Sequence, residues 1–285
     1  MLRKLQLLFG ETSNAAQESM ASRAGPAQYL ASTPRAPGNV SGAPAELASW
    51  EEFYPTLVGA GTIGALASGH AMQGAAAALF QKLDSDAYLE FVKRFYAAGA
   101  GRAGADWKYA DITTALMAAA TLTHPANYLE IGVRRGRSLA AVASVRPEID
   151  IVGFDMWVEN YGGMPNPGPD FVRNEMHRLG HRGRLELVSG DSHETVPAYF
   201  REHPEAFFDL VTVDGDHTDL GARLDLRDVL PRLAIGGVIV FDDIASSGAP
   251  FLRDAWNQYV GGDSRFSCWE FDELGFGIAL GVRNH

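Results

Sequence analysis

The stretch NYLEIGVRRGRSLAAVASV, residues 127–145, decides the fold of this chain. Its first six residues have the apolar character of a buried strand, and residues 138–145 have the pattern of a helix. A glycine-containing loop joins the two. From here strands alternate with helices, which indicates βαβ units around a mostly parallel sheet. The further strands are predicted at 150–155, 184–191, 207–216 and 238–243, and the helices at 169–180, 194–203 and 220–237.

The chain ends in two more apolar stretches, Phe266–Phe271 and Phe276–Val282, separated by a short turn at residues 273–275. A turn of this length joins antiparallel strands, because a parallel connection needs a long crossover. The predicted fold is therefore an α/β, doubly wound, Rossmann-like sheet of seven mostly parallel strands. It ends in an antiparallel hairpin and carries a helical N-terminal extension.

Three segments are predicted along the chain. Residues 1–48 are rich in Ala, Ser, Pro and Gly and are expected to form a flexible arm. Residues 49–124 have helical patterns at 86–99 and 111–122, and we expect a helical region that serves oligomerisation or covers the substrate. Residues 125–285 form the sheet domain.

The segment 56–80 contains no Asp, Glu, Lys or Arg, and its length could span a bilayer. Much of it is alanine and glycine, which supply little transfer energy, so closely packed helices are the better interpretation. Such helices expose little polar surface. We therefore expect them to pack against another subunit in a homodimer or homotetramer.

Composition excludes several classes of partner. The formal net charge is −11, with 24 Lys and Arg against 35 Asp and Glu, which argues against a nucleic-acid partner. The apolar N-terminal run is too short for a secretory signal. The single cysteine, Cys268, excludes an intrachain disulfide and fits a reducing compartment. We expect a cytoplasmic protein with neither nucleic-acid nor membrane partners.

Two glycine-containing segments are candidate nucleotide loops. The first is GAGTIG, residues 59–64, which has the spacing of a dinucleotide loop and would indicate a nicotinamide-dependent oxidoreductase. Its surroundings do not favour that function, because no clear strand precedes it and none follows at Asp84. The competing interpretation is that these small residues allow tight helix contacts.

The second candidate, LEIGVRRGRS at residues 129–138, follows a strand and opens a helix. Gly132 lets the backbone turn close to a ligand, while Gly136 and Ser138 lie where free helix amides can bind one. The carboxylate of Glu130 would repel phosphate, and Asp155 ends the next strand, where it could hold two ribose hydroxyls. These features favour adenosine with a zwitterionic tail over a dinucleotide.

LEIGVRRGRS, Asp155, SGDS (189–192), TVDGDH (212–217) and GGVIVFDD (236–243) together resemble the class I S-adenosylmethionine-dependent O-methyltransferases. The similarity is greatest to the metal-dependent sugar O-methyltransferases of macrolide and related antibiotic biosynthesis. The resemblance implies that Glu130 and Gly132 approach the methionine end, and Asp191 and Ser192 the adenine. The full set of implied cofactor contacts is Glu130, Gly132, Gly136, Ser138, Asp155, Asp191, Ser192 and Asp214.

Three carboxylates, those of Asp214, Asp242 and Asp243, end two strands expected to be neighbours. They repel each other unless a cation neutralises them, and oxygen ligands favour Mg²⁺. The alternative is that Asp242 or Asp243 only caps the next helix. The resemblance further implies that His217 is the general base, a role suited to a neutral imidazole. The remaining histidines of this domain, His177, His181, His193 and His203, are expected to be surface or loop residues.

Residues 157–168, WVENYGGMPNPG, are predicted to be a lid over the cofactor. Trp157 and Tyr161 could face the substrate or anchor the loop. The predicted function is Mg²⁺-dependent methylation, by S-adenosylmethionine, of a hydroxyl on a small natural product, with a sugar hydroxyl favoured. The alternatives are the same reaction on a phenol or polyketide hydroxyl, a nicotinamide-dependent oxidoreductase, and a degenerate cofactor-binding interaction protein.

Overall fold

A seven-stranded sheet in the order β3-β2-β1-β4-β5-β7-β6 organises the computed structural model, which describes residues 57–285. β1 to β5 are parallel to one another, and β7 lies antiparallel between β5 and β6. This confirms the predicted fold class. The strands are β1 (Asn127–Ile131), β2 (Asp150–Asp155), β3 (Leu185–Ser189), β4 (Phe208–Val213), β5 (Leu233–Asp242), β6 (Phe266–Phe271) and β7 (Ile278–Arg283).

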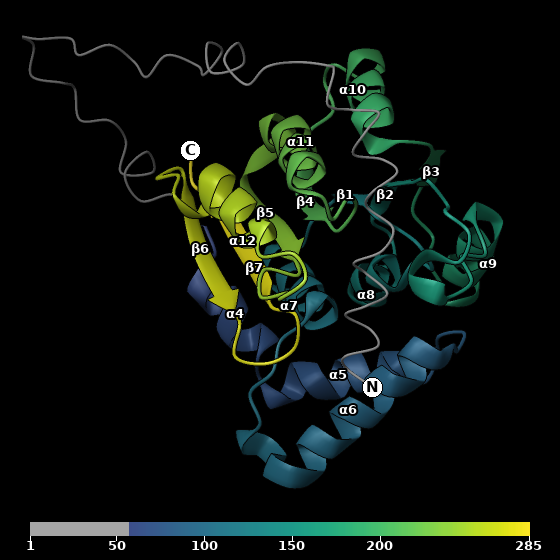
Figure 1. Cartoon of the computed structure of the whole chain (residues 1–285), viewed down its shortest axis with the longest axis vertical. Helices are drawn as coiled ribbons and strands as arrows, with labels where there is room; N and C mark the ends of the chain where they lie inside the picture. Colours follow the sequence, from purple (N-terminus) through teal and green to yellow (C-terminus); the bar gives the residue numbers. More distant parts are fainter. Residues whose placement is uncertain (1–56) are drawn as a thin grey trace, which may run out of the picture. The chain divides into compact units, whose positions relative to one another are not determined.

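Helices cover both faces of this sheet (Figure 1). α4 (Ala60–Ala67), α5 (His70–Phe80), α6 (Ala87–Ala103) and α7 (Ile112–Thr123) precede the sheet in sequence. α8 (Arg137–Val145), α9 (Pro169–Arg178), α10 (Ser192–Glu202), α11 (Asp219–Val229) and α12 (Phe251–Trp256) connect its strands. The sequence did not predict α12, which begins directly after Pro250 and continues into a π-helix, Asn257–Gly261.

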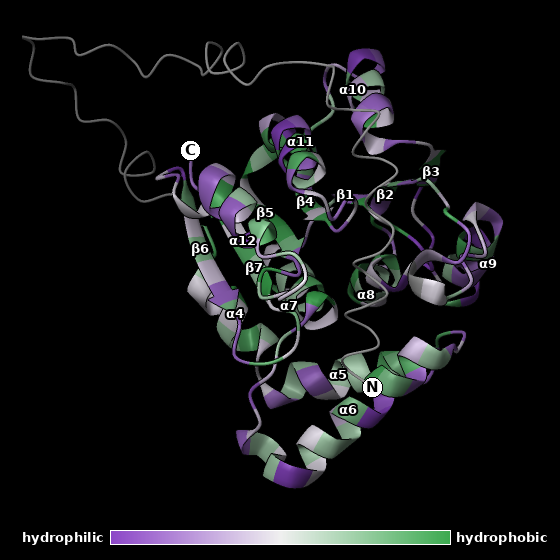
Figure 2. Cartoon of the chain, viewed as in Figure 1, coloured by the Kyte–Doolittle hydropathy of each residue, from purple (hydrophilic) through white to green (hydrophobic). Residues whose placement is uncertain are grey.

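Two apolar layers hold the helices to the sheet. One layer contains buried residues of α4, α5, α7 and α8, and the other contains buried residues of α10, α11 and α12. The strands between them are apolar along most of their length, whereas polar residues lie on the outer turns of the helices (Figure 2). Strands buried on both faces explain the continuous apolar runs that the sequence shows at each parallel strand.

The predicted helix at 220–237 is wrong in its second half. α11 ends at Val229, a 3-10 turn occupies Leu230–Arg232, and β5 already begins at Leu233. Pro231 has no N–H group to continue an α-helix. Leu233 pairs with Phe208, and the register then shifts before Val238 pairs with Leu210. β5 is therefore longer than its apolar run. Its irregular first residues do not show a strand pattern in the sequence.

The arm predicted at 1–48 and the start of the predicted helical region lie outside the described residues. The described part of that region, from residue 57 onward, is helical and belongs to the compact unit Val58–His285 that also contains the sheet. The apolar side chains of α4 and α5 are buried in the core of this same chain. The packing expected against another subunit is thus supplied within the chain, and the oligomeric state stays a prediction.

GAGTIG lies at the start of α4 and is not the loop of a βαβ unit, because residues 57–59 are not a strand. Gly64 is buried, and a Cβ at this position would overlap the indole of Trp269 on β6. The small residues therefore serve close packing, as the competing interpretation held. Within residues 57–285, no helix has the length and apolar character needed to cross a membrane.

Gly64→Ala should lower the free energy of unfolding by about 1–3 kcal/mol, because the added methyl group overpacks the contact with Trp269. Gly61 is a matched control in the same helix: it is exposed and a Cβ there meets nothing within 4 Å. Gly61→Ala should instead raise stability by about 1 kcal/mol through helix propensity. Urea denaturation measures both, and equal effects of the two variants would contradict the packing.

Candidate active site

The glycine loop after β1 touches the loop after β4 through the backbone. Gly132 has φ +97, and a Cβ there would overlap the carbonyl oxygen of Asp214. The amide of Gly132 donates to the Phe154 carbonyl at 2.9 Å, and that of Asp214 donates to the Ile131 carbonyl at 2.9 Å. Only glycine fits this approach without strain. β1 and β4 adjoin where the strand order reverses, which is where sheets of this kind bind ligands.

Glu130, expected to approach the methionine end of the cofactor, lies inside β1 and is completely buried. Ser138 Oγ donates to Glu130 Oε1 at 2.5 Å, and the Tyr128 hydroxyl donates to Oε2. Tyr128 also bonds to Thr212 Oγ1 at 2.8 Å on β4. Burial raises the pKa of Glu130 to about 8, with Asp214 adding to the rise and the two hydroxyl donors opposing it. Ser138 thus ties α8 to β1 through a buried carboxyl group.

Gly136 in the glycine loop and Asp155 at the end of β2 shape the entry of α8. Gly136 has φ +70, and a Cβ there would lie 2.8 Å from Cγ1 of Val172 on α9. Asp155 ends β2, and its carboxylate accepts from the backbone amides of Arg134, at 2.6 Å, and Trp157, at 2.5 Å. Asp155 therefore joins the glycine loop to the first residue of the predicted lid. Its contact with a ribose stays a prediction.

Asp191 and Ser192, expected at the adenine, lie at the start of α10. Asp191 caps the helix by accepting from the amide of His193 at 2.9 Å, and Ser192 Oγ donates to Asp225 at 2.7 Å. His193 is not a surface residue, because its side chain is only 10% exposed between Asp191 (3.1 Å) and Asp225 (3.4 Å). Burial raises the pKa of Asp225 to about 6, against the opposing effect of His193. These groups fix α10 to α11 beside the site.

The other histidines differ in exposure. His177 is exposed, in agreement with the expectation, whereas His181 is half-buried and its Nε2 lies 2.7 Å from the carbonyl oxygen of Ile149. His203 is half-buried at the end of α10, where its ring centroid lies 4.4 Å from that of Tyr199. None of the three lies at the carboxyl ends of β4 and β5.

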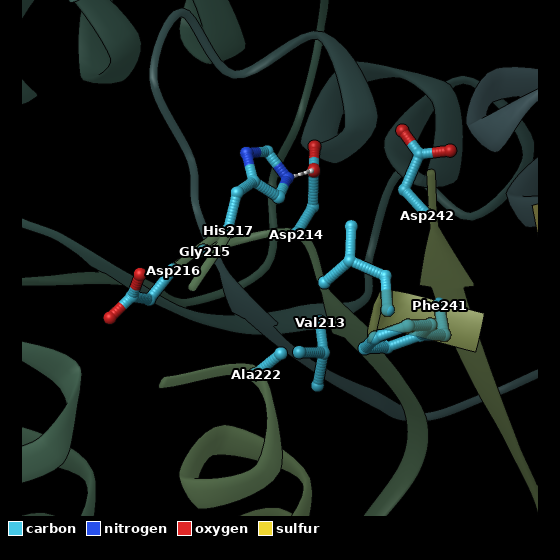
Figure 3. A pocket seen from close by; sticks show the side chains of 9 residues that line it. Val213, Asp214, Gly215, Asp216, His217, Ala222, Phe241 and Asp242 are labelled. Atoms are coloured by element: carbon cyan, nitrogen blue, oxygen red, sulfur yellow. Dashed lines mark hydrogen bonds and ion pairs between the residues drawn. The ribbon is translucent and has the colours of Figure 1, made fainter. Parts of the chain in front are cut away.

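His217 lies between the carboxylates of Asp214 and Asp243, and Figure 3 shows the contact with Asp214. Its Nε2 is 3.3 Å from Asp214 Oδ1 and 3.6 Å from Asp243 Oδ2. Burial lowers the pKa of His217, but the hydrogen bond with Asp214 and the charge of Asp243 outweigh burial and raise it to about 9. Protonated His217 is thus the cation between these two carboxylates in this arrangement. Asp214, Asp216, His217 and Asp242 also line a small pocket, in which the side chain of Asp216 points away from Asp214 and Asp242 (Figure 3).

Asp242 ends β5, and Asp243 follows it in the left-handed region at φ +64. Asp243 is held there by its own backbone, since its amide donates to Gly277 and its carbonyl accepts from Ser246, both at 3.0 Å. Aspartate adopts this conformation more readily than most residues, and such strain is often found at functional sites. Burial raises the pKa of Asp242 well above its usual range, and the charges of Asp243 and Asp214 add to the rise.

These carboxylates match a hard divalent cation in chemistry but are not gathered around one point. Within residues 57–285, no three His, Cys, Asp or Glu side chains are close enough to hold a metal ion. The fit rests on charge: Asp214 and Asp243 both face an imidazolium, and repulsion raises the pKa of Asp242. A bound cation would relieve that repulsion.

The predicted lid reaches His217. The Tyr161 hydroxyl lies 3.0 Å from His217 Nδ1, and Trp157 Nε1 donates to Ser189 Oγ at 2.8 Å. Of the two possibilities left open by the sequence, the structure shows both residues anchoring the segment. Tyr161 also holds the ring of His217 from the side opposite Asp214.

The sequence did not indicate that α6 contributes to this region. Asp86 caps α6 by accepting from the amide of Leu89 at 2.8 Å, and its other carboxylate oxygen lies 2.6 Å from Arg137 Nη2 in the glycine loop. Tyr88 lies under the guanidinium group of Arg137, 5.5 Å from ring centroid to Cζ. The helix cap was readable in the sequence, but its arginine partner, 51 residues away, was not.

Comparison with known proteins agrees with this geometry. Residues 129–244 match a family model described as a methyltransferase domain. A Streptomyces olivaceus enzyme, 8-demethyl-8-(2,3-dimethoxy-alpha-L-rhamnosyl)-tetracenomycin-C 4'-O-methyltransferase, is 27% identical over 157 residues. The match covers 48% of this chain and 59% of that enzyme, which is less than two thirds of its length.

Two solved structures share the fold. The calicheamicin methyltransferase CalS11 superposes with a TM-score of 0.50 and 20% identity, covering 75% of this chain and 91% of CalS11. The O-methyltransferase TomG from Streptomyces achromogenes, solved with S-adenosylmethionine, has a TM-score of 0.51 and 19% identity, covering 71% of this chain and 92% of TomG. The family match supports the resemblance to methyltransferases over residues 129–244, and the two solved structures share the fold.

Glu130 should make stability fall as pH rises. In the unfolded chain its carboxyl group ionises near pH 4.5, whereas the folded one stays protonated up to about pH 8. The folded state therefore binds more protons across this window, and the free energy of unfolding decreases through it, by up to a few kcal/mol. Glu130→Gln should remove this loss.

Urea denaturation at pH 5, 6.5 and 8 gives the free energy of unfolding at each pH. The slope of this free energy against pH is compared, because it does not depend on the absolute stability of the variant. Glu148→Gln is the control, because Glu148 is exposed and pairs only with Arg182 on the surface. Identical slopes for wild type and Glu130→Gln would show that Glu130 does not titrate in this range.

Proposed function

We propose that this chain, whose residues 129–244 form a methyltransferase domain, transfers a methyl group from S-adenosylmethionine to a hydroxyl of a small natural product. The observation that carries the proposal is the grouping of Asp214, His217 and Asp243 at the carboxyl ends of β4 and β5, beside the glycine loop. A binding protein without catalysis needs no base among carboxylates. A dinucleotide oxidoreductase is not favoured, because GAGTIG is part of a packed helix.

The cofactor is proposed to lie over the glycine loop, across the junction of β1 and β4. Gly132 and Gly136 are proposed to let the cofactor approach the backbone closely, because neither position has room for a side chain. Asp155 is proposed to hold the ribose, exchanging a backbone amide for a hydroxyl group. Asp191 and Ser192 are proposed to border the adenine. Glu130 is buried beneath this surface and holds Ser138 of α8 through a hydrogen bond.

A sugar hydroxyl is the proposed acceptor. The Streptomyces olivaceus relative is named as a 4'-O-methyltransferase of a rhamnosyl tetracenomycin. Another structure of CalS11, with a TM-score of 0.50 and 22% identity, is titled a TDP-rhamnose 3'-O-methyltransferase. Both names describe methylation of a sugar. They support the same reaction class for this chain, with antibiotic or related secondary metabolism as its setting.

In the proposed mechanism, Asp214, Asp242 and Asp243 would hold Mg²⁺, which would supply Lewis-acid chemistry toward the acceptor oxygen. A cation on these carboxylates would offset the negative charges that raise the pKa of His217, and the neutral imidazole would then accept the hydroxyl proton at Nε2, the ring nitrogen that faces Asp214 and Asp243. Tyr161 holds Nδ1 and so fixes the plane of the ring. The lid excludes water while the methyl group is placed in line with the acceptor.

Removal of divalent metal should abolish methyl transfer. We expect EDTA to stop the transfer of labelled methyl groups from S-adenosylmethionine to a panel of glycosides, and excess Mg²⁺ to restore it. Asp242→Asn should weaken Mg²⁺ binding in calorimetry without changing the affinity for S-adenosylhomocysteine. Asp219→Asn is the control, because Asp219 pairs with Arg223 on the surface. Full activity of metal-free enzyme would refute the metal role.

His217→Ala should reduce the rate of methyl transfer by about 10²–10⁴-fold, the usual contribution of a general base. Its affinities for S-adenosylhomocysteine and Mg²⁺ should remain, because His217 is proposed to move a proton and not to bind either ligand. Single-turnover kinetics separates the two effects. His177→Ala, an exposed histidine, is the control. If His217→Ala keeps the wild-type rate, the base is another group.

A further inference from the structure

The glycine loop contains three arginines, and ion pairs neutralise two of them. Arg135 lies 2.5 Å from Asp84 and 3.4 Å from Asp86. Arg137 lies 2.6 Å from Asp86. Both arginines thus pair with carboxylates at the start of α6, and their role is to attach this helix to the loop.

Arg134 is different. No carboxylate in the described part of the chain lies within 4.0 Å of its guanidinium group. Its Nη2 contacts the Met164 sulfur at 3.2 Å, and its Cζ lies 5.9 Å from the ring centroid of Tyr88. Its Nε is buried without a hydrogen-bond partner among residues 57–285. A thioether is a weak acceptor, so the guanidinium group has no strong hydrogen-bond partner there, and its charge only opposes the rise that burial causes in the pKa of Asp155.

The backbone holds Arg134 in this position. The residue has φ +49, in the left-handed region, and its amide donates to Asp155 at 2.6 Å. A non-glycine residue is uncommon in this conformation, and the strain is of the kind found at ligand-binding positions. The anchored backbone leaves the side chain directed between the lid and α6.

This position is on the acceptor side of the proposed site. The guanidinium group contacts Met164 of the lid, three residues from Tyr161, which bonds to the proposed base His217. It also contacts Tyr88 of α6. Burial raises the pKa of Tyr88, and Asp242 and Asp243 raise it further, so Tyr88 lies within reach of their charges. Arg134 and Tyr88 therefore lie together where α6 meets the lid.

We propose that Arg134 binds an anionic group, a phosphate or a carboxylate, carried by the acceptor, which makes the substrate a charged glycoside such as a sugar phosphate or nucleotide sugar. The planar guanidinium group binds such oxygens through two parallel hydrogen bonds, and these are stronger than neutral ones. The anion would replace the sulfur of Met164, and Tyr88 would pack against the sugar or base. This inference rests on the proposed function.

The cofactor also carries a carboxylate, so the test must separate the two sources of this chemistry. Arg134→Gln removes the charge but keeps hydrogen-bonding groups. Arg134→Lys keeps the charge but loses the planar pair of N–H donors. Arg102→Gln, on the exposed end of α6, is the matched control. The four proteins are compared by calorimetry, first with S-adenosylhomocysteine, and then, when saturated with it, with thymidine diphosphate, glucose 1-phosphate and the neutral methyl glucoside.

We expect wild type and Arg102→Gln to bind the two phosphates more tightly than methyl glucoside. Arg134→Gln should lose at least about tenfold in phosphate affinity, with Arg134→Lys in between, while affinity for S-adenosylhomocysteine changes by less than about twofold. Weaker binding of S-adenosylhomocysteine to Arg134→Gln would assign Arg134 to the cofactor and overturn the proposal. Unchanged phosphate binding, or none in wild type, would also overturn it. If wild type does not bind S-adenosylhomocysteine, the proposed function itself fails.

Discussion

The backbone contact between Gly132 and Asp214 is the constraint on which the rest of this site depends. It exists because β1 and β4 are neighbours in the sheet. After β1 the chain continues to β2 on one side, and after β4 it continues to β5 on the other side. A side chain at residue 132 would push the two loops apart. With the loops in contact, the groups that follow these strands lie along the same edge of the sheet, with Asp155 on the β2 side and Asp243 on the β5 side.

Charge balance determines how the groups at this edge of the sheet are arranged. Carboxylates gather there because five parallel strands end along one edge, and burial makes their ionised forms costly. The chain meets this cost in three ways. It protonates or hydrogen-bonds Glu130, it places His217 between Asp214 and Asp243, and it pairs the acidic start of α6 with arginines of the glycine loop.

The helices that precede the sheet are part of the core and not an attachment to it. α4 and α7 pack on the sheet, and α6 reaches the glycine loop through Asp86. Tyr88 is consequently placed near the proposed reaction centre by a segment 40 residues before the first strand. Because Asp84 and Asp86 pair with arginines of the glycine loop, a change at the start of α6 would also alter that loop.

The sequence by itself determined the order of strands and helices, the glycine loop and the carboxylates at strand ends, because these depend on local pattern and on the geometry of parallel sheets. Asp225 was missed, although it lies on the apolar face of α11 with Ala222, Leu226 and Val229. Only the tertiary structure decided that Glu130 is buried, that β5 begins at Leu233 and that Tyr161 holds His217. These outcomes depend on partners far apart in the chain, whose packing and charge no local pattern records.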